Sequence, residues 1–172
     1  MLFTIGHSTR QPDEFIGLLQ QHGIRAIVDV RRFPGSRRNP QFGREALDRL
    51  LSENRIEYHW IAALGGRRRS ETSTRSAWRN ASFGAYADYI ETPEFAAGLS
   101  ELLGHADRAR TAIMCAELLW WRCHRRIIAD VLCVRGIEVG HIVDERHTTV
   151  HPLTSPARVV DGKLSYAPSV SD

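Results

Sequence analysis

Lysine is nearly missing from this chain. Only Lys163 is a lysine among its 23 basic residues, and the remaining 22 are arginines. The base composition of a genome explains part of such a bias. The other part is chemical, because the planar guanidinium group of arginine is the better bidentate partner for phosphate and carboxylate. The sequence therefore favours a search for an anionic ligand.

Cysteine is scarce too, with Cys115, Cys123 and Cys133 as the full set. An odd, sparse count argues against a disulfide framework and for a reducing compartment. The first residues lack the basic head and apolar run of a secretory signal. No apolar stretch approaches the ~20 residues that span a bilayer. We expect a cytoplasmic protein with no membrane partner, and its oligomeric state stays open.

The 172 residues contain no internal repeat and no linker of the kind that separates domains. A chain of this length typically forms one domain and buries about 70% of the surface that it exposes when unfolded. Its hydrophobic fraction of 42% and charged fraction of 25% are ordinary for a globular protein. We expect a single domain over residues 1–172, with its core in about 1–147 and a Pro/Ser-rich tail in 148–172.

Short apolar runs alternate with segments of helical spacing along the chain. Strands are expected at 2–6, 26–30, 57–61, 112–115 and 137–143, and helices between Pro12 and Gly23, at 44–54, at 85–103 with a break at Pro93, and from Cys123 onward. This alternation is typical of a parallel sheet with helices on both faces. The sequence predicts an α/β fold: a single three-layer α/β/α domain with a mostly parallel sheet of about five strands.

Two further segments attract attention by their composition. Ala62 to Gly84 is a long polar stretch that carries the triplet Arg67-Arg68-Arg69. A loop of that length within a compact domain is usually functional or mobile. In the tail, Asp161-Gly162 separates two short β-prone pieces, which predicts a hairpin with a type I′ turn.

Polar side chains follow the expected strands where typical turn residues would stand. In open α/β sheets, ligands bind outside the carboxyl ends of the strands, near the point where the strand order reverses. We therefore expect these side chains to share one rim. Arginines, small hydroxyls and helix N-termini together make an anion site, most naturally for phosphate. In chain order, the residues concerned are His7, Ser8 and Thr9, then Asp29, Arg31 and Arg32, then Gly65, Gly66 and Arg67, then Cys115 and Glu117, and finally Asp144, Glu145 and His147.

The segment from Thr111 to Arg135 concentrates the reactive groups. It reads as strand, bulky loop and helix, and its spacing predicts that Cys123 and His124 lie in the first turn of that helix. Free backbone N–H groups and the helix macrodipole would favour an anion there and lower the pKa of a thiol. Cys123, and after it Cys115, is therefore the candidate nucleophile.

The other candidates take supporting roles. Arg31, Arg37 and Arg125 would clamp the anion, with Ser8 and His124 as further ligand contacts. His7 and Glu117 are candidate proton-transfer groups, and Asp29 would orient an arginine or an imidazole. The leading hypothesis is a site that binds or acts on a phosphate-containing ligand, either a nucleotide or a nucleic acid. The residues leave open whether the protein is an enzyme. If it is one, the expected class is a hydrolase or transferase that uses a Cys or a His.

Each candidate also has a purely structural alternative. Asp29 would equally form an ion pair with an arginine, His7 would pack, Ser8 would cap the first helix, and Cys123 would be an inert buried thiol. A second function stays open, a non-catalytic module that contacts nucleic-acid phosphates. Its arginines would be Arg37, Arg38, Arg67, Arg68, Arg69, Arg75 and Arg79.

The third alternative is a Cys/His metal or redox protein. A zinc site would draw on Cys115, Cys123 and His124, but the spacing of this set matches no common zinc finger or ribbon. No metal ligand and no cofactor is assigned from the sequence.

Five short segments carry a resemblance to a known family. They are Gly6-His7-Ser8, Asp29-Val30-Arg31 with Pro34 and Ser36, Gly65-Gly66, Cys115-Ala116-Glu117 and Cys123-His124-Arg125. Together, between Phe3 and about Ile142, they resemble the bacterial and archaeal family catalogued as domain of unknown function 488. The resemblance implies a compact α/β domain whose shared polar residues gather at one site. It implies no established reaction.

Overall fold

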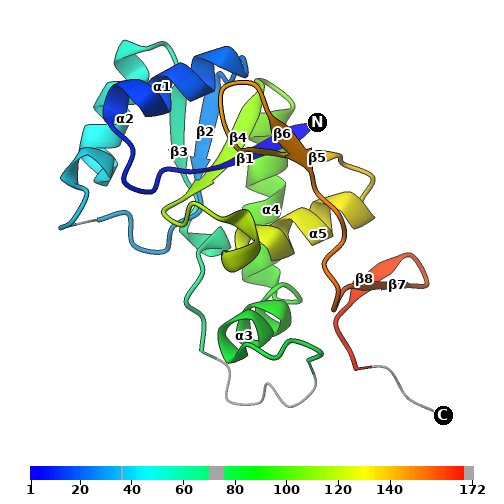
Figure 1. The fold of residues 1–172 in the computed structure, drawn as a ribbon. Helices are drawn as coiled ribbons and strands as arrows, with labels where there is room; N and C mark the ends of the chain where they lie inside the picture. The colour runs from blue at the N-terminus through cyan, green and yellow to red at the C-terminus, as the bar shows by residue number, and fades with distance from the viewer. Residues whose placement is uncertain (36, 70–75, 169–172) are drawn as a thin grey trace.

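A six-stranded sheet forms the middle of the fold. The computed structural model describes residues 1–35, 37–69 and 76–168. The strand order is β3-β2-β4-β1-β5-β6 (Figure 1). The strands are β1 (Leu2–Gly6), β2 (Ala26–Asp29), β3 (Glu57–Trp60), β4 (Thr111–Cys115), β5 (Val139–Ile142) and β6 (Thr148–Val150). The first five are parallel, and β6 is antiparallel to β5. The five predicted strands and the mostly parallel sheet are confirmed.

Helices cover both faces of the sheet, as predicted (Figure 1). Alternate residues of a strand point to opposite faces, so Ile27 of β2 packs in one core and its neighbour Val28 in the other. The first core contains α1 (Pro12–Gln21) and α2 (Arg44–Glu53). The second contains α3 (Ala81–Tyr89), α4 (Pro93–Ala106) and α5 (Arg125–Val134). The result is a three-layer α/β/α architecture.

One predicted helix boundary is confirmed and another is wrong. The break expected at Pro93 is present, because Thr92 caps α4 by accepting a hydrogen bond from the N–H of Phe95 and Pro93 follows as its first residue. The prediction that Cys123 lies in the first turn of a helix is wrong. Trp120–Arg122 form a 3₁₀ turn and Cys123 is extended, with φ −126° and ψ 150°, so α5 begins at Arg125.

The stretch expected to be a long loop is shorter than predicted. A 3₁₀ turn occupies Ala62–Leu64, and Asn80 caps α3, which begins at Ala81. Residues 70–75 of this stretch, including Arg75, lie outside the described residues. Within the described residues, no helix combines the length and apolar character that a membrane crossing needs.

The C-terminal segment packs against the domain. Its first part forms β6, and the predicted hairpin is present as β7 (Arg158–Val160) and β8 (Lys163–Ser165) beside α5 (Figure 1). Asp161 and Gly162 have φ values of 50° and 75°, the positive values that a type I′ turn requires at both central residues.

A buried polar network holds this segment in place. Asp130 of α5 accepts hydrogen bonds from Tyr166 Oη at 2.7 Å, from the N–H and the hydroxyl of Thr154, and from His151 Nε2 at 2.9 Å. His151 Nδ1 is 2.9 Å from Nε2 of His141 on β5. We call these residues the Asp130 network. All of them are buried, so the segment from His151 to Tyr166 is part of the packed structure.

Candidate functional site

The carboxyl ends of β1, β2 and β4 border one cavity of about 690 Å³. We call it the strand-end cavity. Its lining includes ten chemically active side chains: His7, Ser8, Arg31, Arg32, Arg67, Cys115, Glu117, Arg122, Cys123 and His124. Because β2, β4 and β1 are neighbours in the middle of the sheet, loops from distant parts of the sequence meet there. Seven of the ten site residues proposed from the sequence line this cavity.

Two glycines allow the wall of the cavity to close. A Cβ on Gly6 would lie 2.1 Å from the carbonyl oxygen of Glu117, so only glycine lets the loop after β4 pass over the end of β1. A Cβ on Gly66 would lie 2.8 Å from Nδ1 of His124. The absence of that Cβ leaves the ring nitrogen uncovered on this side.

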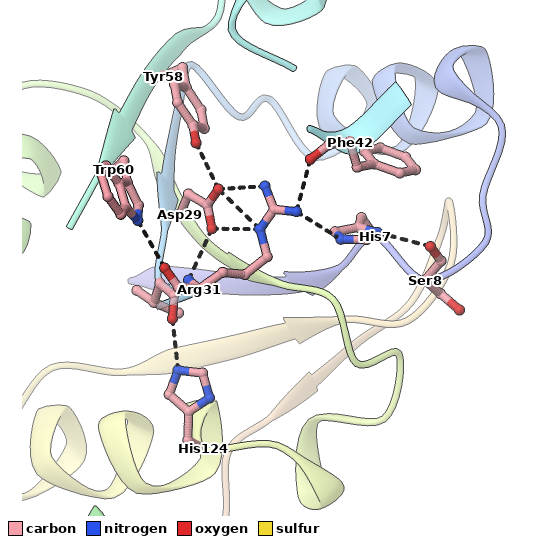
Figure 2. A network of polar contacts seen from close by, with 9 residues as sticks. His7, Ser8, Asp29, Arg31, Phe42, Tyr58, Trp60 and His124 are labelled. Carbon is pink, nitrogen blue, oxygen red and sulfur yellow. Dashed lines mark hydrogen bonds and ion pairs between the residues drawn. The ribbon is translucent and has the colours of Figure 1, made fainter. Parts of the chain in front are cut away.

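Asp29 and Arg31 form a buried ion pair behind the cavity (Figure 2). The guanidinium group donates to Asp29 through Nε at 2.9 Å and through Nη2 at 2.6 Å. Tyr58 donates its hydroxyl to the same carboxylate at 2.7 Å. Burial alone would lower the pKa of Arg31, but the hydrogen bonds and charge of Asp29 raise it overall. Asp29 therefore orients Arg31 and has no exposed surface of its own.

His7 is held in its neutral form. Its Nδ1 lies 2.8 Å from the carbonyl oxygen of Ser8 and must donate to it, and its Nε2 accepts from Arg31 Nη1 at 3.3 Å (Figure 2). The ring stacks on Phe42 with centroids 4.3 Å apart. Burial, opposed by the Ser8 contact and reinforced by the charge of Arg31, lowers the pKa of His7 to about 4. Both ring nitrogens already have partners, so His7 is a positioning group in this state.

The pKa values of the two cavity thiols are shifted in opposite directions. Burial alone would raise the pKa of Cys123, but a hydrogen bond from the Cys115 thiol and the nearby Arg125 and His124 hold it well below its ordinary value. The pKa of Cys115 is raised because its thiol hydrogen-bonds to Cys123 and because it is buried. These opposite shifts favour negative charge on Cys123, with Cys115 as the hydrogen-bond donor, over the reverse arrangement.

Arg125 explains why the negative charge belongs on Cys123. It is the largest fully buried side chain, 1% exposed. Its Nε donates to Cys123 Sγ at 3.3 Å and its Nη2 donates to the carbonyl of Glu117. No carboxylate among the described residues pairs with it. Because an unpaired buried charge is costly, the sulfur of Cys123 is its natural counter-charge.

His124 is fixed from the other side of its ring. Nε2 lies 2.9 Å from the carbonyl oxygen of Val30 and donates to it (Figure 2). Nδ1 then faces Cys123 Sγ at 3.6 Å. The ring also packs edge-on against Tyr86, with centroids 5.1 Å apart. Cys115, Cys123 and His124 offer two sulfurs and one nitrogen that lie within 4.8 Å of one another. We call these three residues the thiol–imidazole cluster, and they are the set that could hold a metal ion.

Three of the proposed site residues do not line the cavity. Asp29 lies behind Arg31 and Arg125 behind Cys123, so both act on the cavity through other side chains. Arg37 is exposed outside the lining. Ser36, used for the family resemblance, lies outside the described residues. Among the three arginines of the proposed anion clamp, Arg31 alone reaches the cavity. Its side-chain N–H groups already contact Asp29, His7 and the carbonyl oxygen of Phe42.

Three other arginines line the cavity and were not part of the proposed clamp of Arg31, Arg37 and Arg125. They are Arg32, Arg67 and Arg122. Arg32 and Arg67 were among the strand-end residues expected at the rim, and Arg67 was also assigned to nucleic-acid phosphates in the second hypothesis. Arg122 lies in the turn before Cys123, and only the three-dimensional path of that turn brings it to the cavity. The strand-end residues after β5, namely Asp144, Glu145 and His147, do not line the cavity.

Comparison with known proteins gives one result. No curated protein and no solved structure gives a match to the chain. One family model matches residues 11–132, which contain β2, β4 and the thiol–imidazole cluster. The resemblance seen in the sequence is thereby confirmed, and the chain belongs to the family described as domain of unknown function DUF488.

Proposed function

We propose that the strand-end cavity binds a phosphate-containing ligand, a nucleotide or a nucleic-acid end, and that any reaction on it takes place at the thiol–imidazole cluster. The observation that carries the proposal is the composition of one cavity wall. Arg32, Arg67 and Arg122 line the same space as the cluster. Guanidinium groups are the preferred bidentate partners of phosphate, and sulfur and imidazole are groups that perform chemistry.

The size and aromatic lining of the cavity favour a nucleotide over a smaller anion. A volume of about 690 Å³ is within the range of small-molecule sites. Phe33, Phe83 and Tyr86 also line it, and Phe33 is 67% exposed. Exposed aromatic rings stack on nucleobases, and such stacking typically contributes about 1–3 kcal/mol per base to the free energy of binding.

Backbone strain at the cavity supports the same proposal. Ser8 and Arg67 have φ values of 48° and 57°, although neither is glycine. Such conformations cost about 1–3 kcal/mol and gather at ligand clamps and active sites. Both residues line the strand-end cavity.

Calorimetric titration of the full chain with AMP, adenosine and inorganic phosphate tests the proposal. AMP should bind more tightly than either part, because the arginines hold the phosphate and the aromatic rings hold the base. Replacing Arg122 by Ala should weaken AMP binding about 10–100-fold, the effect of losing one charge-assisted contact of about 1.5–3 kcal/mol. The matched control is Arg135→Ala, at the opposite end of α5, which should leave the affinity unchanged. Equal affinity for AMP and adenosine, or no binding of either, would refute the proposal.

A second candidate, binding of single-stranded nucleic acid, is favoured by a neighbouring hollow. This hollow of about 910 Å³ shares Arg32, Phe33 and Arg67 with the strand-end cavity and adds Arg68 and Arg69. Arg68 is tied to the carbonyls of Ala62 and Gly65, so Arg69 is the better test. Affinity for an oligonucleotide should fall steeply with salt, and Arg69→Ala should reduce that slope. Affinity independent of salt would exclude this candidate.

A further inference from the structure

We propose that Cys115, Cys123 and His124 bind one zinc ion, with an open coordination position that faces the strand-end cavity. This inference deepens the proposed function, because its meaning for the ligand rests on that function, and it names the group at which the ligand would react. The evidence is the distances between the three ligand atoms, the orientation of the imidazole and the position of the cluster in the cavity wall.

The three ligand atoms lie within about an ångström of the spacing of a tetrahedral zinc site. Zinc binds thiolate at about 2.3 Å and imidazole nitrogen at about 2.0–2.1 Å, which puts neighbouring sulfur and nitrogen about 3.6 Å apart and two sulfurs about 3.8 Å apart. Cys123 Sγ and His124 Nδ1 are 3.6 Å apart. All three atoms lie within 4.8 Å of one another, so closing the site requires a movement of about an ångström by a cysteine side chain.

His124 presents the correct nitrogen. A zinc-binding imidazole usually donates its other N–H to a carboxylate or a backbone carbonyl, which fixes the ring and its tautomer. Here Nε2 donates to the carbonyl of Val30, at the end of β2. Nδ1 then faces Cys123 Sγ and is the ring nitrogen left to coordinate a metal, with release of any proton that it carries. Gly66 leaves this nitrogen free of a neighbouring Cβ.

The remaining contacts suit zinc-bound thiolates. Arg125 donates an N–H to Cys123 Sγ at 3.3 Å, and hydrogen bonds of this kind support ligand sulfurs that carry negative charge. The two sulfurs come from the end of β4 and from the residues before α5, both fixed by the sheet and helix. Soft thiolates with imidazole select zinc over magnesium or calcium, which prefer oxygen.

The site has three protein ligands. Among residues 1–35, 37–69 and 76–168, no fourth Cys, His, Asp or Glu joins the cluster. Structural zinc sites are closed by four protein ligands, whereas catalytic sites keep a position for water or substrate. All three ligands line the strand-end cavity, so the open position faces the space that the phosphate-containing ligand would fill. Glu117 also lines that space and is available to accept a proton from a zinc-bound water.

Metal analysis of the full chain tests the inference. Protein purified without chelator and supplied with zinc should hold one zinc ion per chain. Cys115→Ser, Cys123→Ser and His124→Gln should each weaken zinc binding by more than the roughly 10–100-fold typical for loss of a second-shell partner. Cys133→Ser is the matched control, because this third cysteine lies outside the cluster near the end of α5, and it should retain zinc fully.

Two measurements on the unmutated chain guard against variants that fail to fold. Cobalt added to the metal-free chain should give a thiolate charge-transfer band and the intense visible bands of a tetrahedral site. Zinc should protect Cys115 and Cys123, but not Cys133, from alkylation. Absence of zinc binding, or zinc that is retained without Cys123, would overturn the inference. A chain that binds AMP but takes up no zinc refutes the zinc site alone, and a chain that binds zinc but no AMP refutes the proposed function alone.

Discussion

Replacing Asp130 by Ala should release the C-terminal segment from the second core. Asp130 is fully buried and accepts hydrogen bonds from His151, Tyr166 and both the backbone and hydroxyl of Thr154. Removing one partner of a buried charged network typically costs about 3–5 kcal/mol, because the other partners remain buried without it. We expect the free energy of unfolding to fall by that amount, a large share of the 5–15 kcal/mol usual for a domain.

Urea unfolding and amide hydrogen exchange measure this effect in two independent ways. The exchange rate of the Thr154 amide reports locally, since that N–H donates to Asp130 Oδ1 at 2.9 Å. The matched control is Asp107→Ala, an exposed carboxylate after α4, which should change stability by no more than about 0.5 kcal/mol. If Asp130→Ala costs less than about 1 kcal/mol and leaves the Thr154 amide protected, the network does not hold the segment, and this reasoning fails.

Three further changes test other parts of the structure. Burial, with the charges of His151 and Arg125, lowers the pKa of His141 to about 3. Just below pH 6.5 the His141 imidazole is protonated in the unfolded chain but stays neutral in the native chain. The contribution of His141 to the free energy of unfolding is therefore fully present above pH 6.5, and this free energy should fall by about 2 kcal/mol from pH 7 to pH 5. Urea unfolding should show that it falls more steeply with decreasing pH in the wild type than in His141→Gln. Gly66→Ala would place a Cβ 2.8 Å from Nδ1 of His124, so zinc affinity should fall while the far-UV circular dichroism stays unchanged; unaltered affinity contradicts the placement of that nitrogen. Arg31→Met leaves the buried Asp29 carboxylate without its cation and should cost about 3–5 kcal/mol in urea unfolding; a cost under about 1 kcal/mol would mean that the ion pair contributes little.

The fold was predictable because its signals are local. Strands β1, β2 and β5 are short runs that are buried along their whole length, and β4 is buried up to Cys115. The edge strand β3 (Glu57–Trp60) is the exception, because none of its residues is fully buried. Helices such as α1 and α5 repeat their apolar side chains at a spacing that the sequence displays directly. In α3 the buried residues Gly84 to Ala87 are consecutive, and its start at Ala81 was not predicted. The strand-end rule then located the cavity, since it depends on chain order and not on contacts. The Asp161-Gly162 turn was equally visible, because few residue pairs adopt two positive φ values.

The roles of individual arginines were not predictable, because burial and partners arise from tertiary contacts. Arg31 and Arg125 were predicted to clamp an anion, with an ion pair to Asp29 as the structural alternative. Arg31 forms that ion pair, and Arg125 lies behind Cys123, where it donates to the sulfur. The Asp130 network was invisible for the same reason. It joins residues from α5, β5 and the tail, separated by up to 36 positions in the contact of Asp130 with Tyr166, and its member His141 also contacts Thr4 of β1, 137 positions away.

Arg125 connects the folding of this domain with the chemistry proposed for it. A guanidinium group that is 1% exposed has to find negative charge within the core, and among the described residues the acceptors around it are two carbonyls and Cys123 Sγ. The native packing therefore favours the thiolate form of Cys123 before any ligand arrives. A thiolate is the form that coordinates metal and also the form that acts as a nucleophile. His124 Nδ1 and Cys115 lie beside the same sulfur. A nucleophile requires only the sulfur of Cys123, whereas a metal site requires several ligand atoms close together, and this is why we favour zinc.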